Sequence, residues 1–198
     1  MIIDKNFING YFKEYIFGFM YSDIGNCIKA RANFAVATIL MAYTEKIGAL
    51  INGNLGKLGT SKHDFNTFME YLDFKGDRNY YKDFKIQYKE DISQNIKIIY
   101  IYEAFRCGFV HEYFPKLPCL VYNNANDINQ FVEDDAGIDW INYEGKKTLR
   151  FHTNAYFRDF KKAIDKIYKQ IFVQNDSGII VNIENSLKRI INRVLITP

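Results

Sequence analysis

The sequence predicts an all-α protein, an up-and-down helical bundle that carries one small β-hairpin. Apolar and aromatic residues recur at helical spacing in several long stretches, and the 198 residues include only 12 Gly and 3 Pro. An apolar fraction of 48% beside 25% charged residues is typical of a folded globular protein. At this length we expect a single domain over residues 1–198 with a substantial core.

The N-terminal half is expected to begin with two long helices. Aromatic residues stand at every fourth position between 7 and 19, which predicts an amphipathic helix over 4–21. A break at 22–25 separates it from a helix over 26–52, which is apolar on nearly all faces between Phe34 and Tyr43. A helix of that kind belongs at the centre of a bundle.

The rest of the chain is also expected to be mainly helical. Residues 138–143 and 147–152 flank Glu144 and Gly145 as the two strands of a hairpin flank their turn, so a hairpin is predicted over about 138–152. The helix that precedes this hairpin is expected to end ahead of Pro115, because proline disfavours helical geometry in the residue before it. Helices are predicted over about 61–72, 80–88, 92–113, from 153 or 154 to 171, and over 179–195.

Composition says little about the compartment in which the protein is found or the class of partner that it binds. The three cysteines are odd in number and form no C-x-x-C pair, which favours a reducing cytosol and argues against a cysteine zinc site. The apolar run 34–43 is much shorter than the ~20 residues that span a bilayer, so no membrane segment is expected. A net charge of +3 neither indicates nor excludes a nucleic acid partner.

One stretch points to chemistry. Arg106 and His111 lie five positions apart near the end of an apolar helix. A guanidinium can hold a phosphate through two parallel hydrogen bonds, and an imidazole can transfer a proton near neutral pH. Together they suit the cleavage of a phosphodiester, which makes RNA the expected substrate.

Residues 105–113, FRCGFVHEY, resemble the signature of HEPN domains, in which an Arg is followed after four to six residues by a His on a late helix. The surroundings are similar too, with a central apolar helix that carries Glu45 and a C-terminal helix that opens on residues 157–163, FRDFKKA. The resemblance covers most of the domain in arrangement and about ten residues in detail. It implies an endoribonuclease that needs no metal and no cofactor and acts as a homodimer.

The resemblance also assigns roles. Arg106 would hold the scissile phosphate, and His111 would exchange a proton with the ribose 2′-hydroxyl or the leaving oxygen. The position after the Arg is often polar in the family, whereas this chain has Cys107, and a thiol is a weak hydrogen-bond partner. A protein partner that inhibits or activates the enzyme is compatible with these roles.

Helix geometry adds an expectation about assembly. Side chains five positions apart on a regular α-helix diverge by roughly 140° and are about 7.5 Å apart along its axis. One copy would therefore not focus Arg106 and His111 on one phosphate. A helix loosened at Gly108, or a second copy that supplies the complementary half of the site, would bring them together.

Several nearby side chains are candidates for supporting roles. Glu45 and Glu103 are acids that can orient Arg106, and Glu103 lies three residues before it on the same helical face. Tyr113 and Lys116 can contact a base and a phosphate respectively. Three alternatives stay open: a non-catalytic dimerisation module, a partner-binding module, and a nucleotide-binding module.

Overall fold

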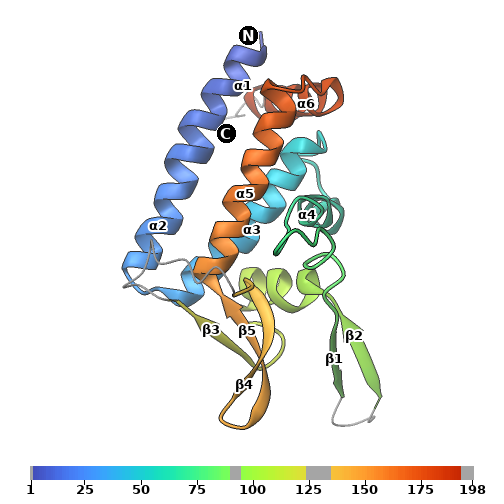
Figure 1. Ribbon diagram of the computed structural model, residues 1–198. Coiled ribbons are helices and arrows are strands. Elements are labelled where there is room, and N and C mark those ends of the chain that lie inside the picture. The colour runs from blue at the N-terminus through green and yellow to red at the C-terminus, as the bar shows by residue number, and fades with distance from the viewer. Residues whose placement is uncertain (1, 90–94, 124–134, 193–198) are drawn as a thin grey trace, which may run out of the picture.

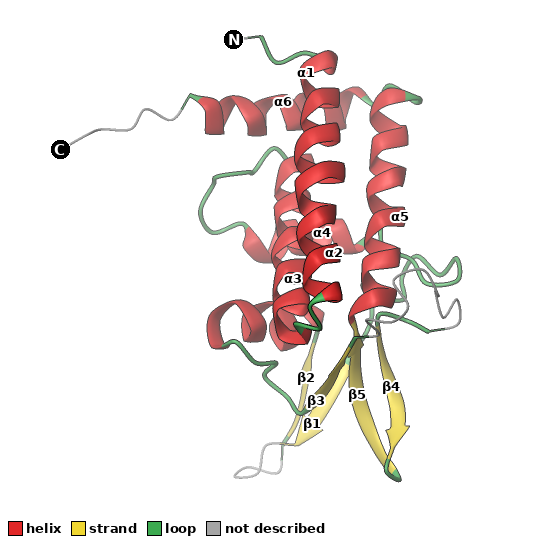
Figure 2. Cartoon of the chain, turned by 90° about the vertical axis from the view of Figure 1, so that its left-hand side faces the viewer, coloured by secondary structure: helices red, strands yellow, loops and turns green. Residues whose placement is uncertain are grey.

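The computed structural model describes residues 2–89, 95–123 and 135–192. Its helices gather in one part of the molecule, and its strands extend from one end of them, as Figures 1 and 2 show. The described residues contain five strands in two sheets beside the helices. The fold is therefore mixed, and the prediction of an all-α protein is wrong.

The N-terminal segment forms one continuous helical rod in three parts: α1 (Lys5–Tyr11), a π-helical segment η1 (Phe12–Met20) and α2 (Tyr21–Lys29). The carboxylate of Asp4 accepts a hydrogen bond from the Phe7 amide at 2.9 Å and caps the start of the rod. The predicted break at 22–25 is wrong, because the helix continues through that stretch. The chain turns only at Arg31, whose φ of 56° is left-handed.

Helix α3 (Asn33–Ile51) lies at the centre of the helical part, as its apolar composition predicts. It packs against α2, α4 (Ser61–Met69), α5 (Thr153–Phe172) and α6 (Ser177–Ile191). By length and mean hydropathy alone α3 could cross a membrane, but more than half of its apolar stretch is buried inside the protein. A helix surrounded by other helices has the same composition.

The C-terminal helices follow the predicted pattern. Helix α5 begins at Thr153, one of the two expected starts, and α6 crosses the far end of the helical part near the N-terminus (Figures 1 and 2). The Asp176 carboxylate accepts hydrogen bonds from the amides of Gly178 and Ile179, which starts α6 two residues before the expected position. The predicted end of this helix, at 195, lies outside the described residues.

The predicted hairpin is confirmed. Strands β4 (Ile138–Tyr143) and β5 (Lys146–His152) pair antiparallel. Positive φ angles at Glu144 and Gly145, 50° and 75°, form the tight turn between them. Strand β3 (Cys119–Tyr122) pairs parallel with the other side of β5, so the hairpin belongs to a three-stranded sheet of order β3-β5-β4.

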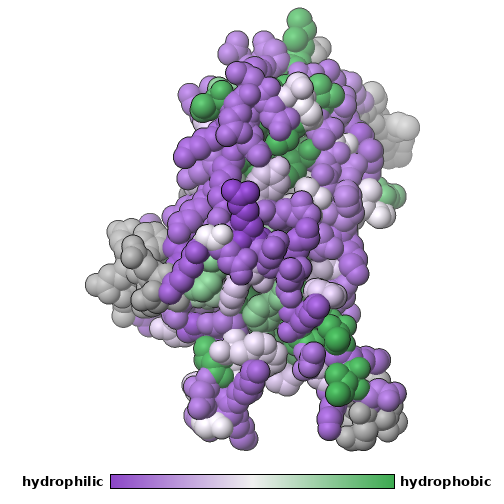
Figure 3. All heavy atoms as spheres, turned by 45° about the vertical axis from the view of Figure 1, so that its right-hand side comes forward, coloured by the Kyte–Doolittle hydropathy of each residue, from purple (hydrophilic) through white to green (hydrophobic). Residues whose placement is uncertain are grey.

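The second sheet lies where the sequence predicts helices. Strands β1 (Ile86–Lys89) and β2 (Ile96–Ile99) pair antiparallel, so the helix expected over 80–88 and the first part of the one expected over 92–113 are wrong. Residues 90–94 of the latter lie outside the described chain. The β-branched side chains of β2 fit a pleated surface better than a helix. Ile96 and Ile98 remain 66% and 51% exposed, and Figure 3 shows hydrophobic side chains gathered on this hairpin.

Candidate functional site

The site is built on the helix that follows β2. Segment η2 (Tyr102–Glu112) is π-helical, so its backbone bonds join residues five apart. In such a helix, side chains at positions i and i+5 lie one above the other. Nη1 of Arg106 lies 2.6 Å from Nε2 of His111. The two side chains therefore meet within one chain, which a regular α-helix would not allow.

A third side chain joins this pair from the central helix. The carboxylate of Glu45, on α3, accepts a hydrogen bond from Nε of Arg106 and forms an ion pair with it. The side chains of Arg106 and Glu45 are only 12% and 19% exposed. The guanidinium also lies 5.7 Å from the centre of the Tyr102 ring, within the range of a cation–π contact.

The contact between Arg106 and His111 constrains the ring. A guanidinium only donates hydrogen bonds, so Nε2 of His111 accepts here and a neutral ring carries its proton on Nδ1. His111 is exposed, so the pair opens to solvent on that side. Arg106 has five N–H groups, and the bonds to Glu45 and His111 occupy two of them. The remaining donors can hold an anion.

A close backbone approach fixes the end of η2. Tyr113 ends the helix in a left-handed conformation with φ 63°, and the chain then folds back over it. The amide of Lys116 donates to the carbonyl of Ala104 at 3.0 Å. A Cβ atom at Gly108 would lie 2.4 Å from the Phe114 carbonyl oxygen. Only glycine lets the chain return this closely across the helix.

The other acid that was expected near Arg106 binds elsewhere. Glu103 forms an ion pair with Lys62 of α4 at 2.6 Å and accepts a hydrogen bond from the Tyr100 amide. Burial alone would raise the pKa of Glu103, but the hydrogen bonds from Lys62 and the backbone outweigh it and lower the pKa. Glu103 thus ties η2 to α4, and Glu45 is the acid that holds Arg106.

The remaining predicted residues lie around the pair. Cys107 is a half-buried free thiol, and together with burial, the larger cause, it raises the pKa of Tyr102. Tyr113 stacks against Phe34 with ring centres 6.3 Å apart. Lys116 reaches Glu112 at 3.4 Å. Cys107, Tyr113 and Lys116 therefore have packing or surface partners of their own.

Two features of the site carry no local sequence signal. Lys62 comes from a different helix, and its role follows only from the tertiary packing of α4 beside η2. A hollow of about 350 Å³ lies after the motif, between Phe34 and the segment 114–119. Its lining is apolar except for Lys116. Aromatic and proline residues there are compatible with core packing as well as with a binding surface, so composition alone does not distinguish the two.

Three comparisons with known proteins bear on the identity of the chain, and the grouping of its side chains bears on metal binding. No protein-family model matches the chain, and no curated protein and no solved structure matches it either. Among residues 2–89, 95–123 and 135–192, no three or more His, Cys, Asp or Glu side chains are grouped to hold a metal ion. The function is therefore inferred from the residues of the site itself.

Proposed function

We propose that this protein is a HEPN-like endoribonuclease that cleaves RNA without a metal ion, with Arg106 and His111 as its catalytic residues. The observation that carries this is the 2.6 Å approach of the guanidinium to the exposed imidazole. The pair joins a fixed positive charge to a group that can transfer a proton, and Glu45 holds the charge in place. The motif at 105–113 also resembles that of the family.

The reaction is a transesterification. The ribose 2′-hydroxyl attacks the adjacent phosphorus and forms a new P–O bond, while the bond from phosphorus to the 5′ oxygen breaks. The free N–H groups of Arg106 bind the phosphate oxygens and stabilise the charge that develops on them. The products are a 2′,3′-cyclic phosphate and a free 5′-hydroxyl.

His111 is the residue that transfers protons in this reaction. For Nε2 to accept the proton of the 2′-hydroxyl, His111 must exchange its contact with Arg106 for one with the substrate. The leaving 5′ oxygen needs a proton in return. We propose that a homodimer supplies it, with His111 of one copy acting as the base and the second His111 as the acid. RNA is then the substrate, and the second copy is the partner.

The products provide the test. Purified protein is incubated in EDTA with an RNA oligonucleotide and with the same oligonucleotide carrying one 2′-deoxyribose, and the fragments are weighed by mass spectrometry. We expect cyclic phosphate ends on the RNA, and no cleavage after the deoxy position. A Lys46→Ala variant, which removes an exposed charge beside Glu45, serves as the active control. Fragments with 3′-hydroxyl ends, or cleavage after the deoxy position, would contradict the mechanism.

A non-catalytic module is the second candidate. It is favoured by the largely buried ion pair between Arg106 and Glu45, which joins η2 to α3 and can serve structure alone. In that case RNA stays intact with the wild-type protein, while His111→Ala or Arg106→Ala changes thermal stability or dimer formation.

A further inference from the structure

An exposed aromatic surface follows His111 in the chain. Tyr113 and Phe114 are 57% and 58% exposed, although phenylalanine is among the side chains most often buried. Their rings lie at 88° to one another with centres 5.9 Å apart, so they form a corner. Phe34 of α3 packs against both, with ring centres 6.3 Å from Tyr113 and 5.3 Å from Phe114. Phe34, Tyr113 and Phe114 together make up the aromatic corner.

The corner keeps one stacking face open. The rings of Tyr113 and Phe34 lie at 27° to one another, so one face of the tyrosine ring is turned toward Phe34. The exposed part of Tyr113 is therefore its other face. A φ of 63° holds Tyr113 in the left-handed region, where glycine or asparagine is the usual residue. Such costly backbone conformations gather at active and ligand-binding sites.

The corner lies beside the proposed catalytic pair. Residues 110–114 are all exposed, so no buried residue separates His111 from the two rings. Because consecutive Cα atoms are about 3.8 Å apart, the Cα atom of Tyr113 is at most about 7.6 Å from that of His111. Side chains this close can reach the phosphate and the base of one nucleotide. Glu112 pairs with Lys116 at 3.4 Å, which offsets the negative charge between them.

The apolar hollow of about 350 Å³ adjoins the corner. Phe34 and Phe114 belong to its lining, which continues through residues 115–119. Lys116 is the charged residue of that lining, and Glu112 balances it. An aromatic wall of this kind suits a flat neutral group better than an anion.

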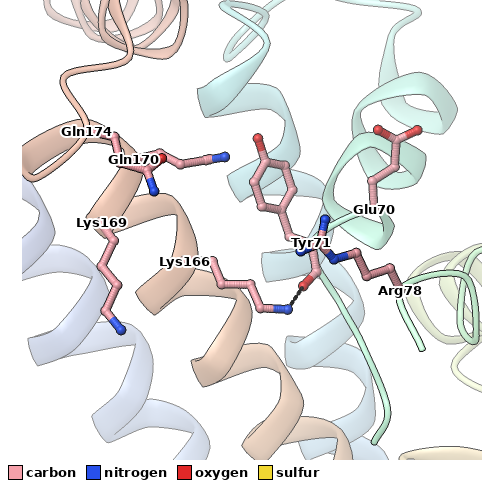
Figure 4. A pocket seen from close by; sticks show the side chains of 7 residues that line it. All are labelled: Glu70, Tyr71, Arg78, Lys166, Lys169, Gln170 and Gln174. Atoms are coloured by element: carbon pink, nitrogen blue, oxygen red, sulfur yellow. Dashed lines mark hydrogen bonds between the residues drawn. The ribbon is translucent and has the colours of Figure 1, made fainter. Parts of the chain in front are cut away.

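A larger hollow, between α5 and the segment that follows α4, offers no comparable set of contacts. Its volume is about 430 Å³. Figure 4 shows Arg78 and Lys169 on opposite sides of it, with the lysine turned away from the arginine. Lys166 donates to the Tyr71 carbonyl at 3.2 Å and pairs with Asp73. Its cations therefore do not converge on one ligand.

We infer that the aromatic corner binds a base of the RNA, next to the phosphate that Arg106 holds. The inference rests on the proposed RNA cleavage. The base stacks on the open face of Tyr113, and its edge meets the ring of Phe114. Every base has a π face, so this contact accepts any sequence. Bases in a duplex are already stacked and paired, so the substrate class is single-stranded RNA.

Oligonucleotides that cannot be cleaved test the inference separately from catalysis. Fluorescence anisotropy measures Kd for a short single-stranded oligodeoxynucleotide, which lacks the attacking 2′-hydroxyl, and for the same backbone without bases. We expect the strand with bases to bind about tenfold more tightly, the order of one base stacked on an aromatic ring. Equal Kd values would overturn the inference and leave the proposed cleavage standing, because RNA cleavage is measured on other strands.

Matched variants locate the base. Tyr113→Ala should weaken binding of the strand with bases by about tenfold and hardly change binding of the abasic strand. Tyr113→Phe keeps the ring and should bind as the wild type does. Tyr143→Ala removes a 47% exposed ring at the end of β4 and should change neither Kd. Equal losses in Tyr113→Ala and Tyr143→Ala would overturn the inference.

A second copy of the chain would cover the corner differently. Size-exclusion chromatography with light scattering compares the mass of the wild type with that of Tyr113→Ala. An unchanged mass supports the base site, and loss of a dimer in the variant would overturn it. On RNA, Tyr113→Ala should raise KM with little change in kcat, because the ring binds the base equally before and during the reaction. Equal cleavage of single-stranded RNA and of a duplex of the same sequence would also overturn the inference.

Discussion

Glu45 accepts a hydrogen bond from Nε of Arg106 across 61 positions of sequence, and this contact ties the motif helix η2 to the central helix α3. Both side chains are largely buried, so the guanidinium is held in one place. The acid that is nearer in sequence, Glu103, pairs with Lys62 instead. The two acids are therefore expected to differ in their effect on cleavage.

Replacing Glu45 by Gln removes the charge that holds Arg106 while it keeps the shape of the side chain. We expect kcat for RNA cleavage to fall by about tenfold with little change in KM, because phosphate binding in the transition state is misaligned. Glu103→Gln, the matched control, should retain nearly full activity. Steady-state kinetics on a defined RNA oligonucleotide measures both. Equal losses in the two variants would show that Glu45 has no special role.

Gly108 tests the backbone approach behind the site. In Gly108→Ala the added methyl group meets the Phe114 carbonyl oxygen and the Lys116 amide, so unfolding should become easier by on the order of 1–3 kcal/mol. Gly25→Ala is the control, because open space surrounds Gly25 in α2 and alanine favours a helix by up to about 1 kcal/mol. Thermal unfolding compares them. A Tm that shifts the same way in both variants would be inconsistent with the close approach.

Buried His152 predicts a pH dependence of stability. Burial first, and then Arg150, lower its pKa from 6.5 to about 4, against the opposing effects of Asp135 and Asp139. Between these values the unfolded chain binds a proton that the folded chain does not. Stability should thus be complete above pH 6.5 and fall as the pH drops toward 4, by about 3 kcal/mol in all.

Urea unfolding between pH 4 and pH 8 measures this loss. We expect the stability of His152→Phe to depend much less on pH than that of the wild type. The stability of His63→Ala should keep the wild-type pH dependence, because His63 is exposed. If His152→Phe does not fold, an NMR titration of the His152 ring in the wild-type protein measures its pKa directly. A ring of His152 that titrates near 6.5 in the folded protein would rule the prediction out.

Periodicity predicted much of the helical part of the fold and little of the remainder. The central position of α3, the start of α5 and the hairpin of β4 and β5 follow from local patterns. Strands β1 and β2 were missed because short apolar runs fit either a helix or a strand, and β1 and β2 pair with each other rather than with the larger sheet. Strand β3 has only four residues, and it forms by pairing with β5, which is distant in sequence.

The candidate site was predictable in its residue types and not in its geometry. Arg106 and His111 stand out because their chemistry suits a phosphodiester. The five-residue spacing argued against a contact within one chain, and the π-helical hydrogen bonds of η2 reverse that conclusion. Helical spacing likewise favoured Glu103 as the partner of Arg106. Only the packing of α3 beside η2 brings Glu45 to it.

The most direct test of the assignment is the rate of RNA cleavage in EDTA by four proteins: wild type, Arg106→Ala, His111→Ala and the double variant. We predict that each single variant loses about 100-fold or more, and that the double variant is hardly worse, because the two residues act as a unit. Equal rates in all four proteins, or no cleavage by the wild type, would contradict the assignment.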